Sequence, residues 1–401
     1  MILTGHTLLE RFLALNDFLL AYQPLWRPKP FTHLTLPWEQ DQPALAHWLR
    51  QRSLEQAEAS HNQPHLLEAP APFPELAHTA QALSEIGGLP ARTLTPLNHR
   101  LCADVPGRKW QQIEAFSSAL SFAKKPAHWL DWCAGKGHLG RLLAHQGGSL
   151  TCLEYDPALV AAGQQLSARL QIEAQHLQQD VLAEDAARHL YAEHTPVALH
   201  ACGDLHVRLL QLASSAGCQQ LAISPCCYNR IAATDYQPLS QPARQSALHL
   251  TRDELGLPLS ETVTAGRRQR LQRDQSMARR LAFDLLQRQQ RGSDDYLPTP
   301  SLPVSWLAKD FPSYCCDLAE LKGIEVTSSP DWQALEQAGW QRLAEVRNLE
   351  LVRNLFRRPL ELWLLLDRAL YLQEQSYNVQ LGTFCPHSLT PRNLLLLAER
   401  P

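Results

Sequence analysis

The residues with the clearest chemical signature form a glycine-rich segment in the first half of the chain. Residues 131–140 contain Gly135, Gly137 and Gly140 in a G-x-G-x-x-G pattern. An apolar run, residues 128–132, precedes the glycines, and an amphipathic run follows them. This order of strand, loop and helix is typical of sites where a nucleotide approaches the backbone at a helix N-terminus. The pattern therefore predicts a nucleotide-binding loop.

A carboxylate just before the glycines indicates which nucleotide binds. Asp131 stands at the end of the predicted strand, where it would face a pyrophosphate resting on the next helix, and two anions repel. S-adenosylmethionine has no phosphate, and its methionine half carries an ammonium and a sulfonium. We therefore favour S-adenosylmethionine, and keep an NAD-binding oxidoreductase as the alternative.

Two further acids follow the next predicted strands. Glu154 ends the second strand, 19 residues after Gly135, a spacing at which a carboxylate accepts both ribose hydroxyls. Asp180 follows the next helix, where an acid or amide can receive the adenine amino group. The alternative for each acid is a helix cap or a solvated surface position.

The methyl acceptor is expected beside residues that follow the fourth and fifth strands. Transfer from a sulfonium requires alignment and a dry pocket, and it requires a base only when the acceptor carries a proton. Asp204 or His200 is the candidate base, and Tyr228 is a candidate for stacking on a flat acceptor. The alternatives are that His200 packs into the sheet, Asp204 caps the following helix, and Tyr228 packs against helices.

The cysteines in these two segments allow a second hypothesis. Cys202 and Cys226 resemble the two-cysteine arrangement of RNA cytosine-C5 methyltransferases, in which one thiolate adds to the pyrimidine. The surrounding motifs do not match those enzymes, and small apolar cysteines that shape a pocket are the alternative. The chain has no C-x-x-C pair, and the adjacent Cys226–Cys227 and Cys315–Cys316 are awkward for bridges or metal sites. We therefore expect no metal.

The elements that must position these residues alternate between strands and helices. Strands are predicted at 128–132, 149–156, 196–204 and 221–228, with helices at 138–146, 157–170 and 206–216. This alternation predicts a parallel sheet covered on both faces. A helix at 359–375 and two strands at 379–385 and 393–399 would close the sheet as an antiparallel pair. The fold class is thus α/β with a mainly parallel sheet; the motifs quoted below imply, by resemblance, that it is the class I Rossmann-like methyltransferase fold.

The rest of the chain divides into an N-terminal region and an insertion. Residues 1–95 alternate helical patterns with proline-rich breaks and predict a helical accessory region. Residues 96–401 would form the main domain, with a helical insertion at about 240–355. Within it, Arg267–Arg291 holds eight arginines against Asp274 and Asp284. This run is a candidate grip for a phosphate backbone, or else a solvated helix face.

Composition limits the location and the partners. Of the 401 residues, 37 are Lys or Arg and 40 are Asp or Glu, giving a net charge of -3, which excludes an overall basic footprint for nucleic acid. The sequence shows no signal peptide and no apolar run long enough to cross a bilayer. Ten cysteines at this length fit a reducing compartment, so a cytoplasmic, membrane-free protein is expected.

Several motifs occur together that characterise a known family. They are DWCAGKGHLGR at 131–141, EYD at 154–156, HACGDL at 200–205, PCCYNR at 225–230, LLDRALYLQEQ at 365–375 and TPRN at 390–393. The chain resembles Rossmann-like S-adenosylmethionine-dependent methyltransferases over roughly residues 100–401. More narrowly, it is similar to the methyltransferase-like group related to ribosomal RNA adenine dimethylase domain-containing proteins and to the methyltransferase part of glutathione S-transferase C-terminal domain-containing proteins.

The resemblance implies a set of cofactor-binding residues: Asp131, Ala134, Gly135, Gly137, Glu154 and Asp180. Lys109 resembles a basic position that precedes the first strand in this group, but Trp110 follows it where the group usually has histidine. The resemblance implies a methyltransferase, with RNA as the preferred acceptor class. Protein or small-molecule acceptors are the alternatives, as is a non-catalytic module that binds the cofactor.

Overall fold

The protein forms two compact units in a computed structural model that describes residues 1–96, 99–103, 105–260, 266–326 and 330–401. The sheet unit comprises Met1–Ala21, Leu83–Ser260 and Arg358–Pro401, and the helical unit comprises Tyr22–Ala82 and Glu261–Arg357. The predicted accessory region 1–95 is therefore divided between the two units. Of the predicted insertion, 240–260 belongs to the sheet unit, and the segment from 261 onward joins residues 22–82 in the helical unit.

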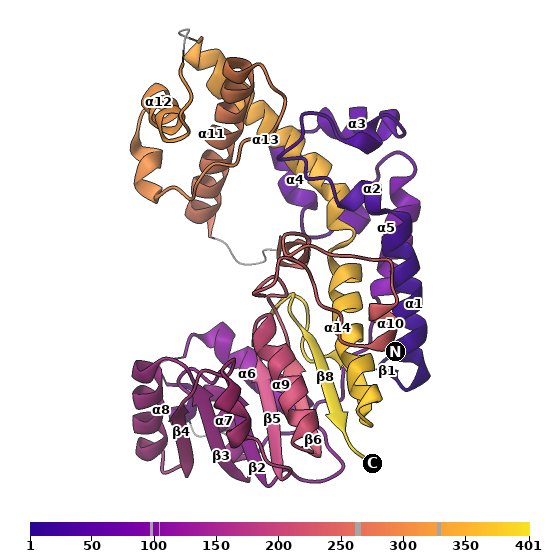
Figure 1. Ribbon diagram of the computed structural model, residues 1–401, viewed down its shortest axis with the longest axis vertical. Coiled ribbons are helices and arrows are strands. Elements are labelled where there is room, and N and C mark those ends of the chain that lie inside the picture. The colour runs from indigo at the N-terminus through magenta and orange to yellow at the C-terminus, as the bar shows by residue number, and fades with distance from the viewer. Residues whose placement is uncertain (97–98, 104, 261–265, 327–329) are drawn as a thin grey trace. The chain divides into compact units, whose positions relative to one another are not determined.

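The sheet unit is built on an eight-stranded sheet with the order β1-β7-β8-β6-β5-β2-β3-β4 (Figure 1). The strands are β1 (Leu3–Thr4), β2 (His128–Trp132), β3 (Ser149–Glu154), β4 (Ala174–Gln178), β5 (His194–Leu199), β6 (Gln220–Ser224), β7 (Asn378–Thr383) and β8 (Leu394–Glu399). Strands β4, β3, β2, β5 and β6 are parallel, and β8 is antiparallel to both β6 and β7. The predicted mainly parallel sheet with an antiparallel closing pair is confirmed.

Helices cover both faces of this sheet. They are α1 (His6–Ala21), α6 (Gly107–Ala119), α7 (His138–His145), α8 (Pro157–Arg169), α9 (Asp204–Ser215), α10 (Gln241–Arg244) and α14 (Arg357–Glu374). On one face, Trp129 of β2 packs in a core with Phe116 of α6 and Leu142 of α7. On the other face, Trp132 donates its indole N–H to the backbone oxygen of Leu205 in α9. This alternation along β2 is the period of two that a strand covered on both faces requires.

Three elements differ from the prediction. Strand β4 occupies part of the segment expected to be an irregular polar stretch, and β1 pairs antiparallel with β7 at the far edge. Within the helical region predicted at 1–95, Pro43–Arg50 and Leu54–Ser60 are two separate helices, because Ser53 caps the second by accepting a hydrogen bond from the backbone N–H of Gln56. Short elements and caps of this kind have little periodic signal in sequence.

A fully buried polar network ties α14 to the chain that follows β6. Asp367 of α14 accepts hydrogen bonds from the Tyr236 hydroxyl, the Ser240 hydroxyl, and the backbone N–H groups of Leu239 and Ser240. Arg368 donates to His206 of α9 at 3.0 Å and to the Tyr236 hydroxyl at 2.5 Å. Both charged side chains are at most 1% exposed. Buried charges are tolerated only when partners of this kind satisfy them.

The helical unit is centred on the long helices α11 (Arg267–Arg291) and α13 (Trp332–Asn354). A Cβ at Gly339 of α13 would lie 2.5 Å from the backbone oxygen of Ala278, so glycine permits the close approach of α11. The unit also contains α2 (Gln23–Trp26), α3 (Pro43–Arg50), α4 (Leu54–Ser60), α5 (Phe73–Ser84) and α12 (Phe311–Leu321). In the described part of the chain, no helix combines the length and apolar character needed to span a membrane.

We expect Asp367→Asn to destabilise the sheet unit strongly. The amide removes the negative charge that receives four hydrogen bonds, and it leaves Arg368 buried without its neighbouring anion. Breaking a buried ion pair in this way lowers the free energy of unfolding by roughly 3–5 kcal/mol. Urea unfolding would measure the change. Glu374→Gln is the matched control, because Glu374 lies on the same helix, is exposed, and accepts a single hydrogen bond from the backbone N–H of Gln241. Equal unfolding midpoints for the two variants would contradict this role.

Candidate active site

The glycine loop is held in a tight turn between β2 and α7. The backbone N–H of Ala134 bonds to the oxygen of Leu153 in β3, and the N–H of Gly137 bonds to the oxygen of Ala134. Gly137 has φ +70°, and a Cβ there would lie 2.7 Å from the His176 ring. Both the left-handed backbone and the close approach require glycine at this position.

Glu154 ties the end of β3 to the same loop. One carboxylate oxygen accepts from the N–H of Gly135 at 2.8 Å, and the other accepts from the N–H of Asp156 at 3.0 Å. Gly135 has φ +58°, and no atom lies within 4 Å of the position its Cβ would take. The loop therefore presents open space beside a partly buried carboxylate, which is the shape that a nucleoside with ribose hydroxyls would fit.

Asp131 lies directly beneath this loop with 2% of its surface exposed. One carboxylate oxygen accepts the N–H of Gly140 at 2.9 Å, in the first turn of α7. Burial raises the pKa of Asp131 to about 7, although the Gly140 N–H and the charge of Arg141 oppose the rise. A buried carboxylate gains stability from a nearby cation, so this position suits the positively charged methionine half of S-adenosylmethionine. The hydrogen bond to Gly140 is also a structural role, because it fixes the start of α7.

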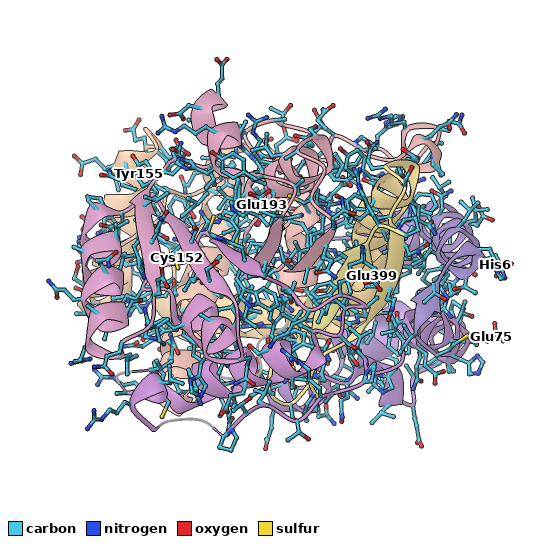
Figure 2. The ribbon with its side chains drawn as sticks, turned by 90° about the horizontal axis from the view of Figure 1, so that it is seen from below. His6, Glu75, Cys152, Tyr155, Glu193 and Glu399 are labelled. Atoms are coloured by element: carbon cyan, nitrogen blue, oxygen red, sulfur yellow. The ribbon has the colours of Figure 1, made fainter. Side chains whose placement is uncertain are left out.

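The three predicted acids lie at the carboxyl ends of three adjacent strands. Strand β3 pairs with β2 on one side and with β4 on the other, and Glu154 stands opposite Gln178, two residues before Asp180. Asp180 is exposed and accepts the N–H of Leu182. In Figure 2, Cys152 of β3 lies inside the fold and Tyr155, just beyond the strand, points outward. The residues present fit S-adenosylmethionine, and their individual contacts with it remain predictions.

Successive strands are added on one side of β2 as far as β4, and then on the other side of β2 from β5 onward. The carboxyl ends of β2 and β5 therefore flank the crevice where ligands bind in open α/β sheets. His200 follows β5 there with φ +67°, and its Nε2 lies 2.9 Å from the Gln112 side-chain oxygen. Burial, together with the charges of Lys109 and Arg392, lowers the pKa of His200 to about 4. The imidazole is therefore neutral near pH 7.

Asp204 is engaged by the protein backbone. Its carboxylate accepts the N–H of Ala232 at 2.8 Å, and its own N–H donates to the oxygen of Arg230. A Cβ on the preceding Gly203 would lie 1.8 Å from that oxygen, so only glycine allows the two segments to meet. The geometry supports a positioning role for Asp204, at the first turn of α9, more directly than a role as base.

Tyr228 packs within the protein. Its ring, 1% exposed, meets the His206 ring edge-on at 5.9 Å and lies 5.2 Å from the Arg368 guanidinium. These contacts occupy the ring that the stacking hypothesis assigned to the acceptor. Within the described residues the buried Tyr228 hydroxyl has no hydrogen-bond partner, and the same holds for the Ser224 hydroxyl and one Asn229 side-chain oxygen. Unpaired buried polar atoms at one strand end are uncommon.

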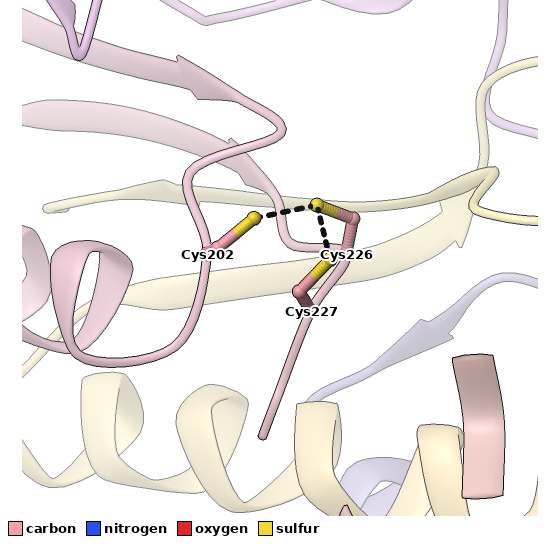
Figure 3. A group of neighbouring side chains, drawn as sticks. All are labelled: Cys202, Cys226 and Cys227. Atoms are coloured by element: carbon pink, nitrogen blue, oxygen red, sulfur yellow. Dashed lines mark hydrogen bonds between the residues drawn. The ribbon is translucent and has the colours of Figure 1, made fainter. Parts of the chain in front are cut away.

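Three cysteines meet at the ends of β5 and β6 (Figure 3). The Sγ of Cys226 lies 3.1 Å from that of Cys202 and 3.6 Å from that of Cys227. Hydrogen bonding from Cys226 lowers the pKa of Cys202 to about 6, and the same interaction raises the pKa of Cys226. In this arrangement the thiolate resides on Cys202, whereas the sequence hypothesis named Cys226 as a catalytic candidate.

Basic side chains surround the acceptor side of the crevice. Lys109 of α6 and Arg392, just before β8, both act electrostatically on His200, and Arg230 acts on Cys202. One Arg392 nitrogen is buried without a hydrogen-bond partner among the described residues. The motif analysis did not single out Gln112 or Arg392 as site residues, because no pattern in the nearby sequence indicates that either side chain acts on His200.

The arginine-rich helix α11 is largely engaged by its own unit. Arg288 pairs with Asp284 at 2.9 Å, and Arg273 contacts Glu58 at 3.3 Å. In the described structure, the arginines of α11 that bond to residues of the chain are Arg273, Arg279, Arg280, Arg288 and Arg291. Arg268 and Arg270 are exposed near its N-terminus. Most of this charge therefore stabilises the helical unit.

The geometry agrees with a comparison to known protein families. Residues 108–234 match the family model described as a methyltransferase domain. This segment is similar to a methyltransferase domain. It contains the glycine loop, Glu154, Asp180 and the cysteine cluster. The match confirms, for this domain, the predicted fold class and enzyme class, an S-adenosylmethionine-dependent methyltransferase, and with them the predicted cofactor.

Solved structures similar to parts of the chain include the following three proteins. TehB from Haemophilus influenzae shares 13% identity over 24% of this chain and 35% of its own, with a TM-score of 0.21. The T. thermophilus 16S rRNA N2 G1207 methyltransferase RsmC shares 21% identity over 30% of this chain and 35% of its own, with a TM-score of 0.24. Magnesium protoporphyrin IX methyltransferase ChlM from Synechocystis PCC 6803 shares 13% identity over 42% of this chain and 70% of its own, with a TM-score of 0.26. This chain spans 35% of the first two, and likenesses this low do not identify an acceptor. No curated protein matches the chain.

We expect Asp131→Asn to change how stability depends on pH. The pKa of Asp131 is about 7 in the folded protein and about 3.9 in an unfolded chain. The folded state therefore holds the proton more tightly, and stability falls as pH rises from about 4 through 7. Asparagine keeps the oxygen that Gly140 needs and removes the titration. Between pH 5 and 7, the free energy of unfolding of the variant should rise relative to that of the wild type by about 1.4 kcal/mol for each pH unit.

Urea unfolding across this pH range measures the effect, with Asp180→Asn as the control because that carboxylate is exposed. Wild-type and Asp131→Asn curves that run parallel across the range would show that Asp131 does not titrate in this window.

Proposed function

We propose that this chain is an S-adenosylmethionine-dependent methyltransferase that acts on RNA, and that it belongs to the narrower methyltransferase-like group that its motifs resemble. The observation that carries the proposal is the division of charge along the carboxyl edge of the sheet. Carboxylates lie at the ends of β2 and β3 and just after β4, and the positive charges of Lys109, Arg230 and Arg392 act on His200 and Cys202 after β5 and on Cys227 after β6. A cationic cofactor fits the first side and a polyanionic acceptor fits the second.

The cofactor side would bind through a small number of groups. Glu154 would accept the ribose hydroxyls, Asp180 the adenine amino group, and Asp131 would balance the charge of the methionine half. The small residues of the loop are Ala134, Gly135 and Gly137. Because no atom lies within 4 Å of a Cβ at Gly135, the cofactor would approach the loop backbone there. When bound, the cofactor supplies an electrophilic methyl group on a sulfonium.

The acceptor side would orient the incoming nucleophile. Gln112 fixes His200 through the 2.9 Å contact, and Asp204 fixes the segment that carries Arg230 and Ala232. His200 is the candidate to receive a proton from the acceptor, and Asp204 is a positioning residue.

RNA is the proposed acceptor class because its phosphates would meet Lys109, Arg230 and Arg392 beside the crevice. The charge that the sequence analysis assigned to Arg267–Arg291 is mostly paired within the helical unit. The proposed contact therefore moves to the sheet unit, and Arg268 and Arg270 of α11 are the remaining exposed candidates. Phosphate contacts of this kind give affinity that falls steeply with salt.

Calorimetric titration with S-adenosylhomocysteine tests the cofactor assignment. We expect micromolar affinity for the wild type and at least about a tenfold loss for Glu154→Ala, since a hydrogen bond to a charged group contributes roughly 1.5–3 kcal/mol. The control is Glu193→Ala, an exposed acid that precedes β5 at the opposite edge of the same sheet (Figure 2). NADH binding in place of S-adenosylhomocysteine would favour the oxidoreductase alternative.

RNA binding tests the acceptor assignment. The double substitution Lys109→Gln and Arg392→Gln should weaken binding of RNA and lower the slope of log affinity against log salt by about 1 for each lost phosphate contact. The control pair is Arg268→Gln with Arg270→Gln on α11. If only the control pair weakens binding, the RNA contact belongs to the helical unit.

A radiolabelled-methyl assay across RNA, protein and metabolite pools completes this test. Label that enters only protein or metabolites would refute RNA as the acceptor. Cofactor binding without transfer to any pool would support the non-catalytic module.

A further inference from the structure

The cysteine cluster brings together three thiols from two separate loops. Cys202 follows β5, and Cys226 and Cys227 follow β6. Their sulfur atoms all lie within 4.8 Å of one another, and Figure 3 shows them converging on one another. The sequence analysis expected no metal because the adjacent pair alone makes a poor site. The fold adds the third sulfur from the neighbouring strand.

We propose that Cys202, Cys226 and Cys227 bind a soft divalent cation, with zinc as the favoured ion. A tetrahedral zinc–thiolate site with bonds of about 2.3 Å separates its sulfurs by about 3.8 Å. The observed separations of 3.1 Å and 3.6 Å fall just below this value, so small side-chain movements would complete the triangle. Each thiol that binds releases its proton to solvent and donates the freed electron pair to the ion.

The surroundings of the cluster favour bound thiolates. Three thiolates and one divalent cation carry a net negative charge, and the positive charges of Arg230 and Arg392 act on Cys202 and Cys227. Hydrogen bonds and charges around the first ligands stabilise metal–thiolate sites in this way.

The ion would keep a free coordination position. Among the described histidine, cysteine, aspartate and glutamate side chains, no fourth ligand joins the three sulfurs. Cys202 and Cys227 are partly exposed and Cys226 is buried, so an ion can enter from the solvent side. Three protein ligands with an open fourth position are typical of catalytic zinc sites, whereas structural sites are closed. This inference rests on the three sulfurs and is independent of the acceptor proposed above.

Metal analysis of the untagged full chain tests the proposal. We expect about one zinc per chain by elemental mass spectrometry after purification with zinc present and dialysis to remove loose ions. Replacement by Co²⁺ should give the intense near-ultraviolet charge-transfer absorption of cobalt–thiolate bonds. Cys227→Ser and Cys202→Ser, made separately so that one folded variant suffices, should lose the zinc and this absorption.

Cys316→Ser is the matched control, because Cys316 is the exposed member of the other adjacent pair and should leave zinc content unchanged. Zinc-free wild-type protein, or zinc retained in both cluster variants, would refute the site. A Cys202–Cys226 disulfide in the zinc-loaded sample, seen as the loss of two titratable thiols and about 2 Da, would also refute it and would identify a redox pair.

Discussion

The buried pair formed by Asp367 and Arg368 is the constraint on which the acceptor side of the sheet unit depends. Charges removed from water must find every partner within the protein, and these two find theirs on α9 and in the chain after β6. Helix α9 begins at Asp204, just beyond Cys202, and Arg368 also lies over Tyr228. One polar network in the interior therefore holds both loops that end at the crevice. An apolar contact has no comparable directionality and would fix neither loop so narrowly.

The carboxyl edge of the sheet is organised by charge as well as by topology. Buried Asp131 carries an unfavourable negative charge at neutral pH, which Arg141 and Lys109 offset in part, and the charges of Lys109 and Arg392 act on His200 beyond β5. A ligand that is positive at one end and a ligand that is negative can approach the same crevice from opposite sides with little competition. His200 follows β5 on the acceptor side, and burial keeps its imidazole neutral near pH 7.

The sequence was sufficient for features that repeat or alternate. The βαβ order, the antiparallel pair β7–β8 and the glycine loop were predicted because hydrophobic periodicity and glycine spacing are local signals. The short polar strand β4 was missed because an edge strand needs no continuous apolar face. The third sulfur and the Gln112 contact were missed because each joins segments that only the fold brings together. The pairing of most arginines of α11 within the helical unit could not be predicted, because sequence does not reveal which charges meet partners in the fold.

Both units are assembled from segments far apart in the sequence, and this has a consequence for biosynthesis. The helical unit combines residues 22–82 with 261–357, and the edge strand β1 at residues 3–4 pairs with β7 at 378–383. Contacts between distant segments slow folding, because the loops between them must close first. On the ribosome, the first 82 residues emerge without their partners and must wait until most of the chain has been translated. The nascent N-terminal segment is therefore the part of this protein most dependent on protection by chaperones during synthesis.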